Sequence, residues 1–153
     1  MARVKLIFPS KNPIFSTEIP LRITDMNYGN HLGNDAVLSL MHDARMRFLA
    51  SHNHTELEIG GCGLIMADVM IAYKGQGYYG DLLKIELFCT EISSRSFDLM
   101  YKITAIRNNT YIDIADAKTG MVAFDYTSNK VTLIPAAFLQ LIDPPAPPSG
   151  AAS

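Results

Sequence analysis

The sequence lacks the features that mark several large classes of protein. Its 153 residues carry 13 basic and 15 acidic side chains, for a formal net charge of −2, so it has no basic excess with which to neutralise nucleic-acid phosphates. No apolar run approaches the roughly 20 residues that cross a bilayer, and Pro9 interrupts the N-terminus too early for a signal peptide. We therefore expect a cytoplasmic protein that binds neither nucleic acid nor membrane.

Cysteine is scarce as well. Cys62 and Cys89 are the only two cysteines, and neither has a His or Cys nearby at the spacing of metal ligands. We expect two free thiols in a reducing compartment and no metal site. Hydrophobic residues make up 48% of the chain and charged residues 18%, which is enough apolar material for one folded domain. We place that domain at residues 1–142 and predict that the proline-rich tail, 143–153, is disordered.

The hydrophobic pattern predicts one long helix among strands. Apolar residues recur at helical spacing over residues 33–51: Val37, Leu40, Met41, Ala44 and Phe48. Further apolar residues lie off that stripe, so we expect a helix that is buried on most sides, with Asn30 or Asn34 as its N-cap.

The strands are expected on both sides of that helix. Residues 14–24 precede it, and residues 64–73, 82–90, 97–106 and 111–125 follow it, before a short helix at 136–141. The run 64–73 is nearly all apolar, which is typical of a strand covered on both faces. We expect the last four strands to form an antiparallel meander in an α+β fold.

The segment 25–35 is the candidate functional site. It reads Asp-Met-Asn-Tyr-Gly-Asn-His-Leu-Gly-Asn-Asp. A histidine within so polar a run is more typical of a functional site than of a buried core position. Asp35 falls in the first helical turn, beside N-terminal amides that favour anions. It could equally be a residue that only complements the helix dipole, as Asn34 could be only a cap and Asp25 only a turn residue. Asp68 stands alone in an apolar strand, so it faces water or lines a pocket, and it is the second candidate for the base.

The order of elements, the segment 25–35 and the following Asp43-Ala44-Arg45 resemble the 4-hydroxybenzoyl-CoA thioesterase family of the hotdog superfamily. That family has approximately Asp-x-Asp-x-x-Gly-His-Val-Asn-Asn, followed by a helix with Glu-x-Arg. The resemblance implies a hotdog fold, in which a curved antiparallel sheet of about five strands wraps around one long central helix. It also implies an enzyme that hydrolyses an acyl-CoA to free acid and CoA without a cofactor, CoA being part of the substrate. Its active sites would lie between subunits of a homodimer or homotetramer.

One departure from the family pattern concerns the base. The family's catalytic aspartate falls on Asn27, and an amide cannot accept a proton as a carboxylate does. We therefore expect Asp35 to act as base or to polarise His31, and His31 to act as base or to orient the water or the carbonyl. Asn27 and Asn34 would hold the water or the thioester oxygen, and backbone N–H groups at the helix start would form the oxyanion hole. The expected substrate-binding residues are Tyr28, Asp68, Ser94 and Arg95.

Two other functions remain open. Hydratases and dehydratases of the same fold use a pattern near Asp-x-Asn-x-x-His, which Asp25 and Asn27 match while His31 comes one residue late. A non-catalytic binder of acyl-CoA or acyl-carrier protein would tolerate Asn27. The acyl group and the thiol carrier stay open too.

Overall fold

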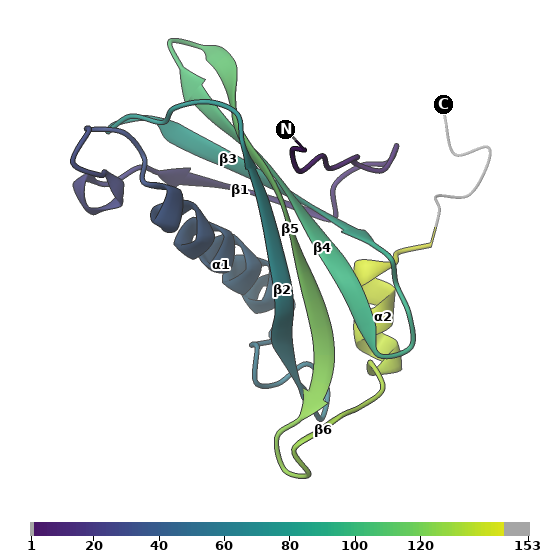
Figure 1. Ribbon diagram of the computed structural model, residues 1–153. Coiled ribbons are helices and arrows are strands. Elements are labelled where there is room, and N and C mark those ends of the chain that lie inside the picture. Colours follow the sequence, from purple (N-terminus) through teal and green to yellow (C-terminus); the bar gives the residue numbers. More distant parts are fainter. Residues whose placement is uncertain (1, 146–153) are drawn as a thin grey trace.

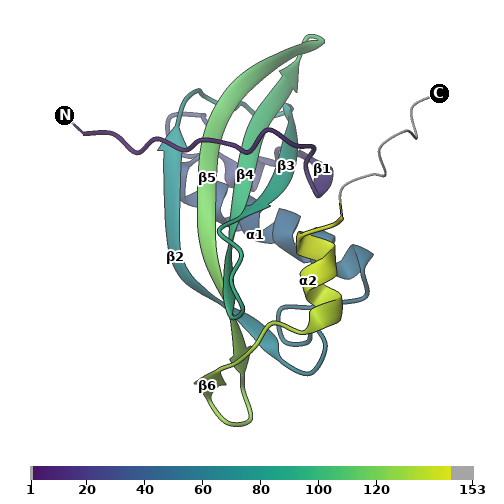
Figure 2. The same cartoon turned by 90° about the vertical axis from the view of Figure 1, so that its right-hand side faces the viewer.

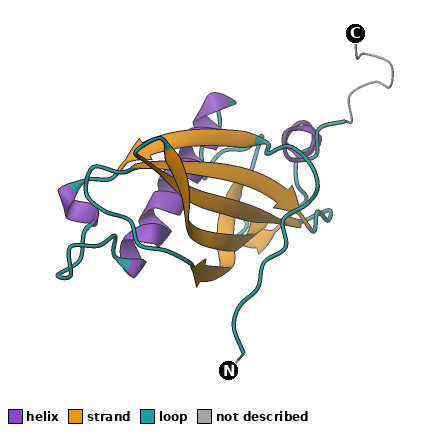
Figure 3. Ribbon diagram, turned by 90° about the horizontal axis from the view of Figure 1, so that it is seen from above, coloured by secondary structure: helices purple, strands orange, loops and turns teal. Residues whose placement is uncertain are grey.

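One curved antiparallel sheet dominates the computed structural model, which describes residues 2–145 (Figure 1). Its strands are β1 (Phe15–Pro20), β2 (Gly63–Tyr73), β3 (Leu82–Thr90), β4 (Ser96–Arg107), β5 (Thr110–Asp125) and β6 (Lys130–Val131). The helical elements are a short 3-10 turn, η1 (Ile23–Asp25), the long helix α1 (Asn34–Ser51) and the short helix α2 (Ala136–Ile142). The sheet bends around α1, which lies against its concave face (Figure 3). This confirms the α+β arrangement expected from the sequence.

Alternation of side chains along β3 and β4 builds the core. The odd-numbered residues of β3 from Leu83 to Cys89 are fully buried, and those of β4 from Phe97 to Ala105 are at most 3% exposed. The pleat turns these residues toward α1 and their even-numbered neighbours toward the convex face. The alternation predicted from the sequence is therefore confirmed.

The strand order differs from the predicted meander. The order is β1-β3-β4-β5-β2, so β3, β4 and β5 follow one another but β2 pairs with β5 at the sheet edge. The prediction was wrong because β1 occupies the free side of β3 and the β2–β3 connection crosses the end of the sheet instead of forming a hairpin. β2 is also less covered than its apolar run predicted: Met66, Val69, Met70 and Tyr73 are 37–48% exposed.

Helix α1 is buried along one side and open along the other. Leu40, Met41, Ala44 and Phe48 are at most 2% exposed, whereas the side that carries Asp35, Leu38, Ser39 and His42 is exposed. The helix was expected to be buried on most sides, but in the described chain only one side of it is buried. The predicted caps are also wrong: the N-cap is Gly33, and no side chain caps the helix start.

Two further segments cover the sheet. The chain before β1 crosses the convex face in extended form (Figure 2), where Phe8 contacts Phe88 edge-to-face at a ring-centroid distance of 5.2 Å. On the other side, Phe138 of α2 packs against Phe97 and His54. Helix α2 ends at Ile142, and the predicted tail lies outside the described residues from position 146 onward.

Candidate active site at the start of the long helix

The segment between η1 and α1 folds into a tight loop whose two ends pair. Met26 and Leu32 form an isolated β-bridge, and the N–H of Asn27 donates to the carbonyl of His31 at 2.7 Å. Asn30 closes the turn with φ of 63°, a left-handed conformation that asparagine tolerates better than most residues. The loop thereby brings Asn27 and His31 side by side, in front of the first turn of α1.

Asn27 shapes this loop with its side chain. Its Oδ1 accepts hydrogen bonds from the N–H of Gly29 at 2.9 Å and from the N–H of His31 at 3.2 Å. Asparagine commonly forms such local turns. The amide oxygen is thus engaged with the backbone, which leaves only the amide nitrogen of Asn27 for the predicted contact with water or thioester.

His31 lies in the loop before the helix start, and Asp35 lies in the first turn of the helix. The half-buried His31 ring contacts the ring of Tyr78 edge-to-face, with centroids 5.3 Å apart. Asp35 is exposed in the first turn of α1, and its Oδ1 lies so close to Gly33 that a Cβ on that glycine would come within 2.6 Å of it. Neither side chain takes part in a hydrogen bond with other described residues, so both are available to a ligand.

The first turn of α1 also presents free backbone donors. Gly33 donates to the carbonyl of Asp25, and Val37 makes the first helical bond, to Gly33. Within the described residues, the intervening N–H groups of positions 34–36 have no partner, as is usual for a helix start without a side-chain cap. These donors point out of the helix N-terminus, where the helix dipole favours negative charge.

Tyr73 joins this site from β2, although it was absent from the predicted site residues. Its hydroxyl donates to the carbonyl of Asn34 at 2.9 Å. Partial burial, and secondarily the charge of Asp35, raises the pKa of Tyr73, so its hydroxyl keeps its proton at neutral pH. The side chain of Asn34 itself makes no described hydrogen bond. No local sequence pattern predicts this contact of Tyr73, because the contact depends on how β2 is placed beside α1.

Asp25 is a structural residue of the loop. Its carboxylate accepts from the N–H of Arg22 at 2.8 Å and pairs with the Arg22 guanidinium, and it is only 6% exposed. These bonds close the 3-10 turn, in line with the turn-fixing role considered from the sequence.

The predicted substrate-binding residues are scattered in the described chain. Tyr28 belongs to the site loop and is fully exposed. Asp68 accepts hydrogen bonds from two residues of β5, the ammonium of Lys118 and the N–H of Gly120. These bonds lie next to an irregularity in the β2–β5 register. Its hydrogen bond with Lys118 lowers the pKa of Asp68. Position 68 shares the convex face with its ladder partner Gly120 and with Asp98, so it lies across the sheet from α1.

Ser94 and Arg95 lie at the far end of the sheet. They belong to the β3–β4 connection, whereas the site loop adjoins the opposite end of β3. A nine-residue strand separates the two ends by roughly 30 Å. Within one chain, the structure does not bring Ser94 and Arg95 to His31 and Asp35.

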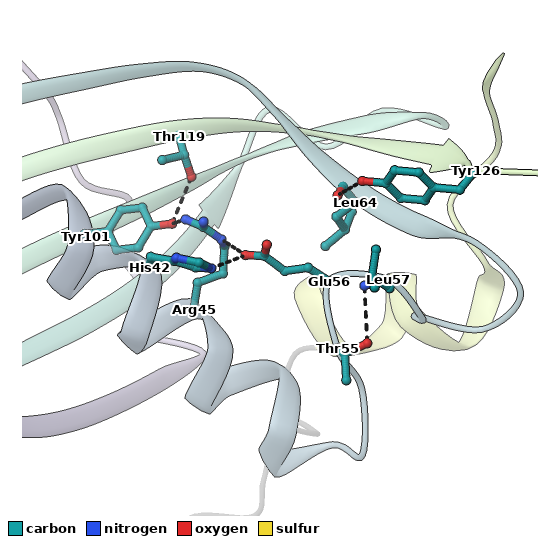
Figure 4. A network of polar contacts seen from close by, with 9 residues as sticks. All are labelled: His42, Arg45, Thr55, Glu56, Leu57, Leu64, Tyr101, Thr119 and Tyr126. Carbon is teal, nitrogen blue, oxygen red and sulfur yellow. Dashed lines mark hydrogen bonds and ion pairs between the residues drawn. The ribbon is translucent and has the colours of Figure 1, made fainter. Parts of the chain in front are cut away.

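A groove lies along the open side of α1, about one helical turn beyond Asp35. It has a volume of about 390 Å³ and is lined by Leu38, Ser39, His42, Arg45, Glu56 and Met66. Asp35, Ser39 and His42 follow at spacings of four and three residues, which places them on one helix face. The floor is polar (Figure 4): Glu56 Oε1 lies 2.7 Å from Arg45 Nε and 3.4 Å from His42 Nε2.

Other reactive side chains in the described chain are placed less favourably for chemistry. Both cysteines are free and buried, and burial raises the pKa of Cys89 to about 12. Among residues 2–145, no three His, Cys, Asp or Glu side chains are grouped so as to hold a metal ion. Of the helices in this part of the chain, none has the length and apolar character to span a membrane.

Comparison with known proteins identifies the fold and the family. Residues 21–142 match the family model of the thioesterase-like superfamily. A 1,4-dihydroxy-2-naphthoyl-CoA thioesterase from Synechocystis is similar in structure, with a TM-score of 0.74, 20% sequence identity and coverage of 85% of this chain and 96% of that one. A thioesterase-superfamily protein from Jannaschia sp. CCS1 has a TM-score of 0.74 at 15% identity, covering 88% of this chain and 84% of its own.

A third similar structure contains a ligand. It is a mutant of 4-hydroxybenzoyl-CoA thioesterase, with asparagine replacing one aspartate, in complex with 4-hydroxybenzoyl-CoA. Its TM-score is 0.75 at 13% identity, with coverage of 84% of this chain and 97% of that one. No curated protein sequence matches this chain. The likeness to these structures confirms the hotdog fold that the sequence motif suggested.

Proposed function

Because this chain belongs to the thioesterase-like superfamily, we propose that it hydrolyses an acyl-coenzyme A thioester at the start of α1. One observation carries the proposal. The unpartnered N–H groups at positions 34–36 lie in the same first turn as the exposed carboxylate of Asp35, and the loop that precedes this turn carries the half-buried imidazole of His31. Thioester hydrolysis needs both a base for water and donors for the developing oxyanion.

The helix start would supply the oxyanion hole. As water attacks, the thioester carbonyl oxygen gains negative charge, which fixed backbone donors stabilise without reorganising. The amides of the first turn of α1 point out of the helix, and the carbonyl of Asn34 is fixed by Tyr73 at 2.9 Å. This bond ties the helix start to β2, so the donors keep their direction as charge develops.

Asp35 and His31 would activate the water. We assign the base to Asp35, because the carboxamide of Asn27 cannot accept the proton and the Asn27 oxygen is engaged with the backbone. His31 would orient the water or carry its proton to the leaving thiolate. The products are then the free acid and the thiol of coenzyme A, with atoms and protons balanced by one water.

The groove beside α1 would receive the acyl group. Leu38 and Met66 supply apolar wall, while His42, Arg45 and Glu56 make its inner end polar. Its open side suggests that a second copy completes it. β2 pairs with β5 along one edge and has no partner along its other edge among the described strands. Three apolar side chains of this strand are also exposed: Met66, Val69 and Tyr73. We therefore propose a homodimer, which could also bring Ser94 and Arg95 of one subunit toward the CoA bound to the other.

A second function is worth testing because of Asn27. The related thioesterase forms a complex with 4-hydroxybenzoyl-CoA as an aspartate-to-asparagine mutant, and asparagine is the native residue at position 27 of this chain. A protein that binds acyl-CoA without turning it over would show the same residue.

Release of free thiol from a panel of short, long and aromatic acyl-CoAs tests the proposal. The wild-type protein should release thiol from at least one of them, and Asp35→Asn and His31→Gln should each lower kcat by about 10²- to 10⁴-fold, the range for lost acid–base catalysis. Asp43→Asn is the matched control, since Asp43 is a half-exposed carboxylate on the same helix whose partner among the described residues is Arg47. Acyl-CoA binding by calorimetry without any thiol release would reject hydrolysis and support the binder.

A further inference from the structure

The β2–β3 connection, residues 74–81, is fastened to the loop that carries His31. The N–H of Leu32 donates to the carbonyl of Gly77 at 2.8 Å, and the N–H of Leu21 donates to the carbonyl of Asp81 at 2.9 Å. Gly77 sits so close that a Cβ there would come within 3.0 Å of the Leu21 side chain and 3.1 Å of that of Leu32. The absence of a side chain at position 77 therefore permits this contact between the two loops.

Tyr78 follows directly and reaches the imidazole. Its ring meets the His31 ring at an interplanar angle of 71°, the edge-to-face geometry that aromatic rings favour. Its hydroxyl donates to Oε1 of Gln76 at 3.0 Å, and its backbone N–H donates to Asp81 at 2.9 Å. Tyr78 is thus hydrogen-bonded both at its hydroxyl and at its backbone N–H.

Arg107, the last residue of β4, contacts Tyr78, Asp81 and Gln76. Its guanidinium carbon lies 4.6 Å from the centroid of the Tyr78 ring, in a cation–π contact. Its Nε and Nη2 both donate to the carboxylate of Asp81, and Nη2 also donates to the carbonyl of Gln76 at 3.0 Å. Asp81 is only 6% exposed and the Arg107 side chain is 28% exposed, so this forked ion pair is partly shielded from water.

We propose that Tyr78 and Arg107 are positioning residues that fix the orientation of the His31 imidazole. The role rests on the proposed function of His31. No hydrogen bond to another described side chain orients this ring, so the aromatic contact is what limits its rotation. No hydrogen bond from another described residue occupies Nδ1 or Nε2, so both stay available for water or thioester. An active-site side chain loses rate when it is free to turn, since only a fraction of its orientations is productive.

The first experiment measures orientation without relying on activity. In the full-length protein, the imidazole Cε1–Hε1 signals of all four histidines are recorded by NMR, and His31 is assigned with His31→Gln. Tyr78→Leu should remove the ring-current contribution to the His31 signal and shift it, while the signals of His52 and His54, which contact Phe48 and Phe138, keep their positions. Arg107→Gln should shift the His31 signal in the same direction by a smaller amount.

The second experiment measures the consequence for turnover. Tyr78→Leu should lower kcat by about tenfold or more with little change in KM, because orientation of His31 rather than substrate affinity is lost. Tyr78→Phe retains the ring and should keep kcat within about threefold of wild type. Tyr111→Leu is the matched control, since Tyr111 is an exposed tyrosine whose described contact is with Lys84.

The outcomes separate this inference from the proposed function. An unshifted His31 signal in Tyr78→Leu, or equal kcat for Tyr78→Leu and Tyr78→Phe in an active protein, would overturn the positioning role and leave hydrolysis intact. A shifted signal in a protein that hydrolyses no acyl-CoA would support the positioning of the ring and reject the hydrolase. Should Tyr78→Leu fail to fold by circular dichroism, Arg107→Gln and Arg107→Lys carry both measurements, and Arg107→Lys should fall between wild type and Arg107→Gln.

Discussion

Arg45 on α1 donates from Nη1 to the hydroxyl of Tyr101 in the middle of β4, at 2.9 Å and 56 positions further along the chain. Tyr101 is fully buried and shares a second hydrogen bond with the hydroxyl of Thr119 on β5. Burial raises the pKa of the Tyr101 hydroxyl, which therefore stays neutral and accepts from the cation. A buried charge thus connects the centre of the helix to the centre of the sheet, immediately beneath the groove.

Removing Glu56 should destabilise the protein because it leaves Arg45 without its carboxylate. Arg45 is 5% exposed and its Nε lies 2.7 Å from Glu56 Oε1. Breaking a buried pair costs about 3–5 kcal/mol, and since the Glu56 side chain is 27% exposed we expect about 2–3 kcal/mol for Glu56→Ala. Urea unfolding measures this free energy, and Arg45→Met combined with Glu56→Gln should recover much of the loss.

The matched control for this prediction is Asp43→Ala. Asp43 and Arg47 pair on the surface of the same helix with side chains about two-fifths exposed, and such a pair contributes about 0.3–0.5 kcal/mol. A loss for Glu56→Ala no larger than that for Asp43→Ala would show that the buried network contributes little to stability.

The ion pair between Asp81 and Arg107 should make stability depend on acidity. The hydrogen bond from Arg107 is the main cause that lowers the pKa of Asp81 in the folded protein. A carboxyl whose folded pKa is below its unfolded value, about 4, stabilises the fold above that value and loses the effect as pH falls through the folded pKa. The free energy of unfolding should therefore drop as the pH is lowered below about 4.

Asp81→Asn isolates this contribution from that of other carboxylates. The difference in unfolding free energy between wild type and Asp81→Asn should be largest near neutral pH and should shrink under acid. Urea unfolding across this pH range measures it. A difference that stays constant with pH would mean that Asp81 acts through its shape and hydrogen bonds rather than its charge.

The sequence predicted those parts of the fold that depend on local pattern. Alternation along β3 and β4 identified the buried side chains, and the apolar spacing of α1 identified its inner face. The β2–β5 pairing was missed because a strand's partner depends on contacts far away in sequence, and the eight residues 74–81 between β2 and β3 left a hairpin possible. For the same reason Tyr73 could not be assigned to the helix start from the sequence.

The candidate site was predictable only where it is contiguous. The loop that carries His31 and the first turn that carries Asp35 adjoin in the chain, so their proximity follows from the helix start. Asp68 was a candidate because it is isolated among apolar residues, but its bonds to Lys118 and Gly120 arise from the irregular register of β2. Ser94 and Arg95 lie in the β3–β4 connection, far from the site. The sequence alone does not show this distance, because it depends on the direction of β3 in the sheet.

Asn27→Asp should return catalytic power to a protein that has lost Asp35. An aspartate at position 27 can accept the same N–H bonds from Gly29 and His31 that the asparagine accepts, so the loop should keep its shape. Its carboxylate then supplies a base next to His31, at the position on which the sequence motif predicts the catalytic aspartate to fall. In the Asp35→Asn background, we expect Asn27→Asp to raise kcat for acyl-CoA hydrolysis at least about tenfold, part of the range for a general base.

Asn27→Ala in the same background is the control for this exchange. It removes the acceptor of both N–H bonds, so it should cost about 0.5–1.5 kcal/mol of stability per bond lost and recover no activity. If Asn27→Asp folds with wild-type stability and still restores nothing, a base cannot reach the water from position 27 in this loop. Asparagine there would then serve the loop alone, and the chemistry would belong to the first turn of α1.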